Sequence, residues 1–493
     1  MRAPGRSGGR GRLAATVTAA GMIVSVVAAG CMPAAPACST SSAAHASGSQ
    51  AAPGAPLWFC RYAGPAGGYS DASAIAVSPD GSAVFVAGSS LRTGRLGHNI
   101  AAHYVTVGYD SATGRQLWAT LFRGQGDSRL SAIAVSPDGR IVFVTGSSLG
   151  ATRHDEYATI AYSAATGRQL WLRTYSWPVG DAVATALVVS PDGTTVFVTG
   201  YNDGFLTGHY GGGSTTIAYN AATGAQRWLS VFKGNNQARD IAISPDGKIL
   251  YVTGQSRRPA SQWDYLTVAY NAATGAARWA ARYNGPANGL DYANAVVVAP
   301  GGKSVYVTGG SWSTSRSMGA EFATVAYNAV TGAQRWAARS HGRGIGMSLA
   351  VTPNGRTVIV AGPSIGPSGP GLGVGYATVA YNAATGAAVW TRRTLGYPGI
   401  ANSNTHTLAI GPDSRTVYVT GVTAVACCDY HYATVAYATA TGTQLWLSTG
   451  SGPGSKGGSA NALALSPDGS TLYVTGASSF GTATGFATIA YQT

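Results

Sequence analysis

The chain has 493 residues, enough for a large core or several domains, but only 10% of them are charged and 69 are glycine. This composition suits tight turns and strands, and no long stretch after residue 30 places apolar residues at helical spacing. The net charge is +14, yet no basic run is interleaved with aromatic residues, which disfavours nucleic-acid binding.

Residues 1–30 have the pattern of a secretory signal. Four arginines within the first twelve residues precede a mostly apolar stretch from Leu13 to Gly30. The segment Val27 to Cys31 resembles a bacterial lipobox with Cys31 as the lipidated residue. We therefore expect a protein on the extracellular face of the bacterial cell membrane, held by a lipid anchor alone.

A second signal-cleavage site remains open. Cleavage after Ala44-His45-Ala46 would give a freely secreted protein instead. Residues 31–56 are rich in Ala, Pro, Ser and Gly and are expected to form a flexible tether. No later apolar stretch is long enough to span a bilayer.

From residue 57 to the end, one pattern recurs eight times at intervals of 53–59 residues. Its centre is a Pro-Asp-Gly turn, degenerate in the fifth, sixth and seventh copies. The turns begin at Pro79, Pro137, Pro191, Pro245, Pro300, Pro353, Pro412 and Pro467. A fixed period of this length indicates a repeat architecture.

One copy reads as four strands. In the second copy these are residues 132–135, 141–146 and 157–162, and a strand that opens at 169–171. They are β-branched, aromatic or alternating, and turn residues separate the first from the second and the third from the fourth. Eight such units predict an all-β, eight-bladed β-propeller of four-stranded antiparallel blades over residues 57–493.

The two ends of the chain indicate how the ring closes. The last copy stops after its third strand, at Thr493, and its missing strand appears at the other end as Leu57-Trp58-Phe59. We expect this N-terminal strand to complete the last blade, which removes an exposed sheet edge. The repeat tryptophans should pack between neighbouring blades; they are Trp58, Trp118, Trp171, Trp228, Trp279, Trp336, Trp390 and Trp446.

The segment Ala218 to Trp228, with Asn220 and Thr223-Gly224 inside it, resembles the tryptophan-docking motif of quinoprotein dehydrogenases. Ser-Pro-Asp-Gly followed by Val-Phe-Val-Thr-Gly is similar to YVTN-type propellers, and residues 282–327 are similar to SBBP-type extracellular repeats. All three resemblances imply a propeller. The first also implies pyrroloquinoline quinone (PQQ) and calcium as cofactors.

The carboxylates argue against that chemistry. Calcium takes several oxygen ligands, usually with carboxylates among them, and this chain has only eighteen carboxylates in all. Six of them belong to the repeat turns: Asp80, Asp138, Asp192, Asp246, Asp413 and Asp468. We therefore expect no catalytic residue, no metal site and no cofactor, with a PQQ- and calcium-dependent dehydrogenase as the alternative. His154-Asp155-Glu156 and Asp429-Tyr430-His431 are interpreted as ordinary polar loops rather than metal ligands.

Once Cys31 carries lipid, an even set of cysteines remains: Cys38, Cys60, Cys427 and Cys428. An exported protein with such a set is expected to form disulfides. A Cys60–Cys427 bridge, with Cys38 taking the other partner, would fasten the closing strand. Two alternatives stay open: an adjacent Cys427–Cys428 pair, as in some quinoprotein alcohol dehydrogenases, and free or metal-binding thiols.

The links between the first and second strands and between the third and fourth strands are short and uniform, whereas the other links vary in length. The variable links should share one face of the propeller, and we expect the binding site there. Three tryptophans stand outside the repeat register, Trp177, Trp263 and Trp312, and Arg257, Arg258, Asp264 and Tyr265 are their neighbours in the sequence. Exposed Trp and Arg are typical of binding hot spots; alternatively, the rings fold back over loop backbone. We predict a monomeric binding or scaffold module for a cell-envelope protein or glycan.

Overall fold

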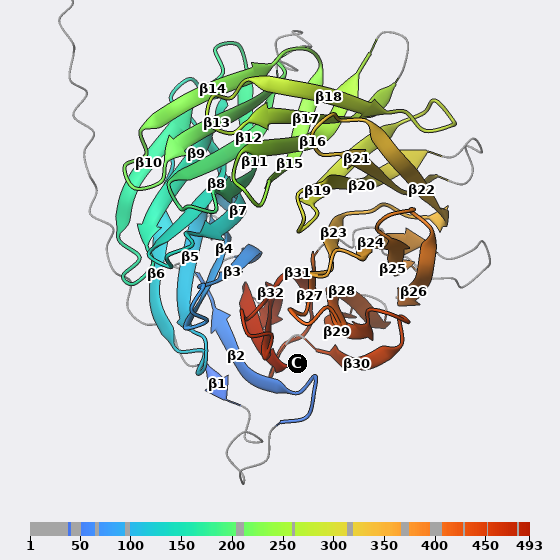
Figure 1. Cartoon of the computed structure of the whole chain (residues 1–493). Helices are drawn as coiled ribbons and strands as arrows, with labels where there is room; N and C mark the ends of the chain where they lie inside the picture. The colour runs from blue at the N-terminus through green and yellow to red at the C-terminus, as the bar shows by residue number, and fades with distance from the viewer. Residues whose placement is uncertain are drawn as a thin grey trace, which may run out of the picture.

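The protein is described by a computed structural model that covers residues 38–40, 51–64, 69–93, 99–203, 212–258, 262–312, 319–365, 374–394, 407–426, 429–450, 452–480 and 483–493. These residues form eight antiparallel sheets, seven of four strands and one of five, and contain no helix. The sheets are arranged as the blades of a ring (Figure 1). The predicted eight-bladed β-propeller is confirmed.

The blades follow the chain. Blade 1 is β3 (Ser70–Val77), β4 (Ala83–Thr93), β5 (Asn99–Asp110) and β6 (Gln116–Phe122); blade 2 is β7 (Ser128–Val135), β8 (Ile141–Leu149), β9 (Asp155–Ser163) and β10 (Gln169–Tyr175); blade 3 is β11 (Asp181–Val189), β12 (Thr195–Asp203), β13 (Ser214–Asn220) and β14 (Gln226–Phe232); blade 4 is β15 (Asn236–Ile243), β16 (Ile249–Arg257), β17 (Trp263–Asn271) and β18 (Ala277–Tyr283).

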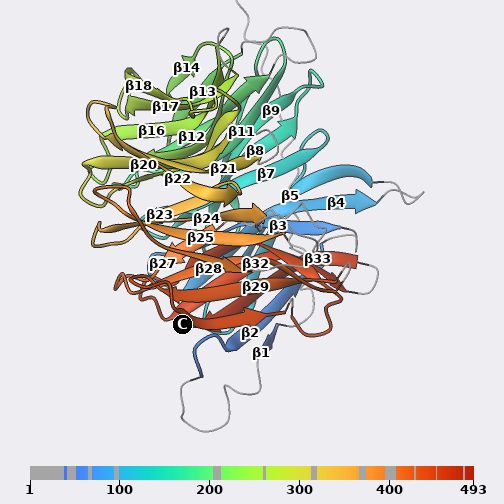
Figure 2. The ribbon, with the colours of Figure 1, turned by 90° about the vertical axis from the view of Figure 1, so that its right-hand side faces the viewer.

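The second half repeats the pattern. Blade 5 is β19 (Asp291–Val298), β20 (Ser304–Trp312), β21 (Ala320–Asn328) and β22 (Gln334–Arg343); blade 6 is β23 (Ser348–Val351), β24 (Thr357–Ile365), β25 (Val374–Asn382) and β26 (Ala388–Thr394); blade 7 is β27 (Thr407–Ile410), β28 (Thr416–Ala426), β29 (Asp429–Ala438) and β30 (Gln444–Thr449); blade 8 is β31 (Gly458–Leu465), β32 (Thr471–Phe480), β33 (Ala483–Gln492), β2 (Pro56–Tyr62) and β1 (Ser39–Thr40). Figure 2 places blades 3 and 4 at the top and blade 8 at the bottom.

The repeat turn between the first two strands of a blade is stabilised by its own side chains. In blade 2, the Asp138 carboxylate accepts hydrogen bonds from the Ser136 hydroxyl at 2.5 Å and the Arg140 amide at 3.1 Å. Gly139 has φ near +72°, which favours glycine. These bonds lower the pKa of Asp138. The turn carboxylates are therefore engaged in local structure, as the sequence predicted.

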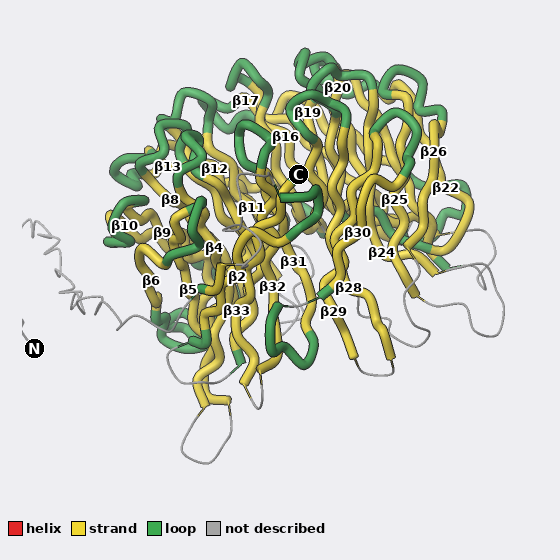
Figure 3. The backbone as a smooth tube through the Cα atoms, turned by 90° about the horizontal axis from the view of Figure 1, so that it is seen from below, coloured by secondary structure: helices red, strands yellow, loops and turns green. Residues whose placement is uncertain are grey.

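Antiparallel connectivity sorts the connections onto two faces (Figure 3). The turns between the first and second strands and between the third and fourth strands share one face, which we call the short-turn face. The links between the second and third strands and between successive blades share the other, which we call the variable-loop face. Variable loops on a rigid scaffold are the usual place for binding.

The repeat tryptophans join each blade to the next. Trp118 of blade 1, for example, donates from Nε1 to the Ala164 carbonyl in blade 2 at 2.7 Å, and the bare Gly167 leaves room for its ring. Among the described residues, seven of these indoles donate in this way; the pairs are Trp58–Ser111, Trp118–Ala164, Trp171–Ala221, Trp228–Ala272, Trp279–Ala329, Trp336–Ala383 and Trp390–Thr439. The predicted packing role is confirmed.

The ring closes as predicted: β2 pairs with β33 and completes blade 8. In the other blades a turn joins the third strand to the fourth, but in blade 8 these two strands come from opposite ends of the chain. Residues from both ends take the place of that turn. Gly54 donates to the Gln492 carbonyl at 2.8 Å, and Gln492 donates to the Ala55 carbonyl at 2.9 Å. Gly54, with φ near +80°, lies against the Trp446 ring, as Gly167 lies against Trp118. The propeller therefore begins before residue 57.

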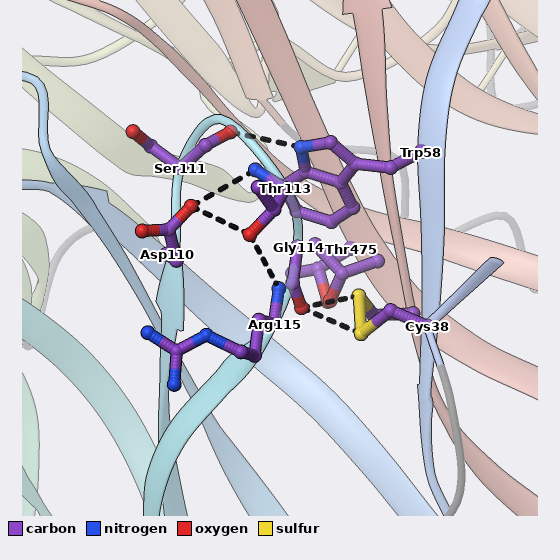
Figure 4. Close-up of a disulfide and its surroundings, with 10 residues drawn as sticks. Cys38, Trp58, Asp110, Ser111, Thr113, Gly114, Arg115 and Thr475 are labelled. Carbon is purple, nitrogen blue, oxygen red and sulfur yellow. Dashed lines mark hydrogen bonds between the residues drawn. A yellow bond between two sulfur atoms is a disulfide. The ribbon is translucent and has the colours of Figure 1, made fainter. Parts of the chain in front are cut away.

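The predicted Cys60–Cys427 bridge is wrong, because Cys60 is bonded to Cys38 (Figure 4). The strand β1 pairs with β2 beside this bond, Ser39 opposite Phe59 and Thr40 opposite Trp58. Both sulfurs pack against the Gly114 carbonyl oxygen of blade 1, at 2.5 and 2.7 Å. Part of the predicted tether thus belongs to the fold. Cys427 and Cys428 lie outside the described residues.

In the described ranges, no helix is both long and apolar enough to cross a membrane.

Candidate functional site

The three tryptophans outside the repeat register lie on the variable-loop face, as expected from connectivity. Trp177 follows β10 in the link between blades 2 and 3, Trp263 opens β17, and Trp312 ends β20. Trp263 pairs with Arg257 across β16 and β17, and Trp312 pairs with Ala320 at the matching end of blade 5. Trp263 and Trp312 therefore occupy equivalent ends of adjacent blades.

Each of the three indoles is half-buried, but their surroundings differ. Trp177 packs on the core shared by blades 2 and 3, and its indole nitrogen is buried without a hydrogen-bond partner among the described residues. This ring therefore folds back onto the scaffold. The backbone of Trp312 donates to the Leu290 carbonyl at 3.2 Å, which ties its strand end to the preceding loop.

The four sequence neighbours divide into exposed and buried residues. Arg257 and Arg258 are exposed, whereas Asp264 and Tyr265 are buried. The Tyr265 hydroxyl donates to the Ala323 carbonyl of blade 5 at 3.0 Å, and burial raises its pKa well above the usual value. Tyr265 is thus a packing residue between blades rather than a surface contact. The remaining surface set is Arg257, Arg258, Trp263 and Trp312.

A partly buried ion pair supports the Trp312 end of this surface. The Arg339 guanidinium lies 3.1 Å from the Glu321 carboxylate, and their side chains are only 18% and 13% exposed. Arg339 also donates to the Trp312 carbonyl at 3.2 Å. Charge-assisted bonds of this kind are short and directional, so they fix the relative positions of the groups that they join. Arg339 thus connects Trp312 to the outer strand of blade 5.

Most of the blades carry a second aromatic residue at the position that directly follows that of Arg339. Four residues after the repeat tryptophan, blades 8 and 1 to 4 carry Tyr62, Phe122, Tyr175, Phe232 and Tyr283. Tyr283, for instance, packs against Tyr265 with ring centroids 5.4 Å apart. Blades 5, 6 and 7 carry Ser340, Thr394 and Gly450 at this position. Because these side chains are small, the aromatic layer is interrupted there.

Two cavities coincide with this interruption. One, of about 350 Å³, lies between blades 5 and 6 and is bordered by Ser340 and Arg339 on one side and Arg393 on the other. The second, of about 460 Å³, lies between blades 7 and 8 beside Gly450 and Phe59. Neither cavity is among the features predicted from the sequence, although the loss of the second aromatic residue is visible in the repeat itself.

In the part of the chain that the structure describes, no group of three or more His, Cys, Asp or Glu side chains is arranged to hold a metal ion. His154 instead lies 3.3 Å from the Asp181 carboxylate, and the Asp155 amide donates to the same oxygen at 2.9 Å. Burial and the nearby Asp181 charge raise the pKa of Asp155.

Comparison with known proteins gives a family and a fold. A family model described as outer membrane protein assembly factor BamB matches residues 101–315, 213–446 and 321–487. A search of curated proteins found no significant match.

Two solved structures show the breadth of the fold. Sqt1 of Chaetomium thermophilum, bound to the N-terminus of ribosomal protein L10, has a TM-score of 0.56 at 13% identity, over 87% of this chain and 98% of that one. Quinohemoprotein alcohol dehydrogenase of Comamonas testosteroni has a TM-score of 0.52 at 14% identity, over 85% and 74%. At such identities the likeness concerns the fold alone.

Proposed function

The chain belongs to the family of the outer membrane protein assembly factor BamB, and from this premise we propose that it is an exported module that binds a cell-envelope partner without catalysing a reaction. The variable-loop face of blades 4 and 5 would make the contact. One observation carries this proposal: Trp263 and Trp312 are half-buried at equivalent ends of adjacent blades, outside the repeat register that packs the ring.

The chemistry of this surface suits recognition. Trp and Arg are enriched at the centres of binding interfaces because they offer large, stiff contact area and directional hydrogen bonds. Arg257 and Arg258 are exposed beside Trp263, and the Arg339–Glu321 pair holds the Trp312 strand end in place.

Replacing both Trp263 and Trp312 with alanine is expected to reduce capture of the envelope partner at least tenfold, because each lost indole removes on the order of 1–2 kcal/mol of contact energy. Tagged protein and cell-envelope extract would be mixed, and the bound fraction measured against protein concentration.

The matched control for this experiment is Val330→Ala. Val330 is 62% exposed in a turn on the opposite face of blade 5, so its loss should leave capture unchanged. Both variants should retain the parent thermal midpoint within a few degrees. Capture that survives the double substitution would reject this surface.

We also propose that the mature chain begins at Cys31 and is lipid-anchored, which would place it at the extracellular face of the cell membrane. Cleavage after Ala46 would discard Cys38 and β1, and would leave Cys60 without its disulfide partner. The disulfide and the fifth strand of blade 8 therefore support retention of residues 38–40. Cys31 lies only seven residues before Cys38, a reach of about 25 Å, so the anchor would hold blade 8 near the membrane.

Mass spectrometry of the protein from its own membranes should find an acylated N-terminus at Cys31. Cys31→Ala is expected to move the protein into the soluble fraction, because one anchor alone is proposed to retain it. Cys38→Ala should lose the disulfide but keep the lipid. A mature chain that starts at Ser47 would contradict this proposal.

A further inference from the structure

We propose that the cavity between blades 5 and 6 binds one acidic sugar unit of a cell-envelope glycan. This inference rests on the proposed binding function and narrows its partner to a chemical class. It concerns a site next to the Trp263 and Trp312 surface rather than the surface itself, since Arg339 contacts both the Trp312 carbonyl and the cavity.

The cavity lies where other blades place an aromatic ring. Blade 4 fills the equivalent space with Tyr283, whose ring packs on Tyr265. Blade 5 has Phe322 in place of Tyr265 and Ser340 in place of Tyr283. Phe322 therefore has no aromatic partner at position 340 and lines the cavity. Its volume of about 350 Å³ lies within the range of small-ligand pockets.

The lining offers the groups that a sugar ring needs. Phe322, Val379 and Tyr381 supply apolar surface, and Ser340 and Thr391 supply hydroxyls on opposite walls. Sugar rings present both C–H faces and hydroxyl edges, so a mixed wall of this kind complements them. A small inorganic anion would leave the apolar part of the cavity unfilled.

The charge of the lining favours an acidic sugar. Two arginines border the cavity, Arg339 and Arg393, and the described residues that line it include no carboxylate. Glu321 offsets Arg339 from the far side, at 3.1 Å. Arg393 is exposed at the rim, where its guanidinium packs against Gly342 of blade 5. A guanidinium at a rim can bind a carboxylate through two parallel hydrogen bonds.

The proposal is tested by sugar titrations of the wild-type protein and of a variant with an aromatic side chain at position 340. Full-length folded protein is titrated with glucuronate, and with glucose as the uncharged match, by calorimetry or ligand-observed NMR. Glucuronate is expected to bind at least fivefold more tightly than glucose. Ser340→Tyr should abolish binding of both sugars and leave the thermal midpoint equal or higher, because a Tyr283-like side chain fills the space.

Two further variants separate charge from shape. Arg393→Gln should weaken glucuronate at least fivefold and leave glucose unchanged. Gln334→Tyr, at the exposed short-turn end of the same strand β22, should change neither titration. The titrations use purified protein and no envelope extract. A negative titration would therefore reject the sugar site without rejecting partner capture by the Trp263 and Trp312 surface.

Three outcomes would overturn the proposal. They are no saturable glucuronate binding, unchanged binding to Ser340→Tyr, and tighter binding of phenylacetate than of glucuronate. The last result would assign the cavity to a ligand that combines an aromatic ring with a carboxylate, and not to an acidic sugar.

Discussion

Replacing Trp58 with alanine is expected to lower the free energy of unfolding by about 3–5 kcal/mol, as large-to-small changes of buried aromatics do. Trp58 is 1% exposed, packs on Tyr109 and Tyr473, and donates to the Ser111 carbonyl at 2.8 Å. These contacts join the closing strand β2 to blade 1. The substitution therefore leaves a cavity at the one place where the ring is closed by non-covalent contacts between the chain ends.

Chemical denaturation measured by near-ultraviolet circular dichroism would give this difference. Trp177→Ala is the control, because that indole is half-buried in a link between blades and should cost clearly less. Deletion of residues 57–60 should abolish the cooperative transition altogether, since it also removes Cys60. A Trp58→Ala protein as stable as the control would refute the closing role of β2.

Asp71→Asn is expected to raise the free energy of unfolding by about 1–3 kcal/mol at pH 7.5 and to change it little at pH 4. Burial raises the pKa of Asp71 from 3.8 to about 6, while a hydrogen bond from Asn461 of blade 8, at 2.6 Å, partly offsets this. The folded state thus binds the proton more tightly than the unfolded state. The contribution of protonated Asp71 to the free energy of unfolding is complete below pH 3.8 and is lost as the pH rises through about 6.

Asparagine at position 71 can still accept the Asn461 bond through its carbonyl oxygen, so the substitution removes the charge and keeps the contact. Stability should be measured by denaturation at several pH values between 4 and 7.5. Asp138→Asn is the opposite case: hydrogen bonds lower the pKa of that exposed turn carboxylate, so its replacement should not stabilise the protein at pH 7.5. Parallel pH profiles for wild type and Asp71→Asn would refute the account.

The blade pattern was predictable because its signals are local. Pro-Asp-Gly turns, alternating strands and a tryptophan shortly after the Thr-Gly turn between the third and fourth strands are properties of short segments. The closure by Leu57-Trp58-Phe59 followed from counting strands at the two ends. Even so, Gly54 was assigned to the tether, because nothing near it in the sequence indicates that it replaces a missing turn against Trp446.

The errors concern contacts between segments that are distant in the sequence. Cys60 faces Cys38 rather than Cys427, and cysteine spacing by itself leaves the pairing open. The sequence places Tyr265 with the surface residues because it follows Trp263 by two residues. The structure buries it between blades 4 and 5, since the strand passes from the rim into the core within that step.

The cavity between blades 5 and 6 is also only partly predictable from the sequence. The serine at position 340 is plain in the repeat, but a missing aromatic can be compensated by a neighbour. Only the packed structure shows that Arg393 and Phe322 leave the space open and that Arg339 reaches Trp312 from its edge.

The amino-acid sequence by itself determined the number of blades, the strand order and the residues that join one blade to the next, because each repeat encodes its own turns and packing residues. The tertiary structure decided which cysteine bonds to Cys60, where the ring begins, and which side chains meet at the variable-loop face. Those features depend on the closed ring, which brings residues 38–40 and 54–60 against residues 111–114 and 483–493 and sets the gap between two adjacent blades.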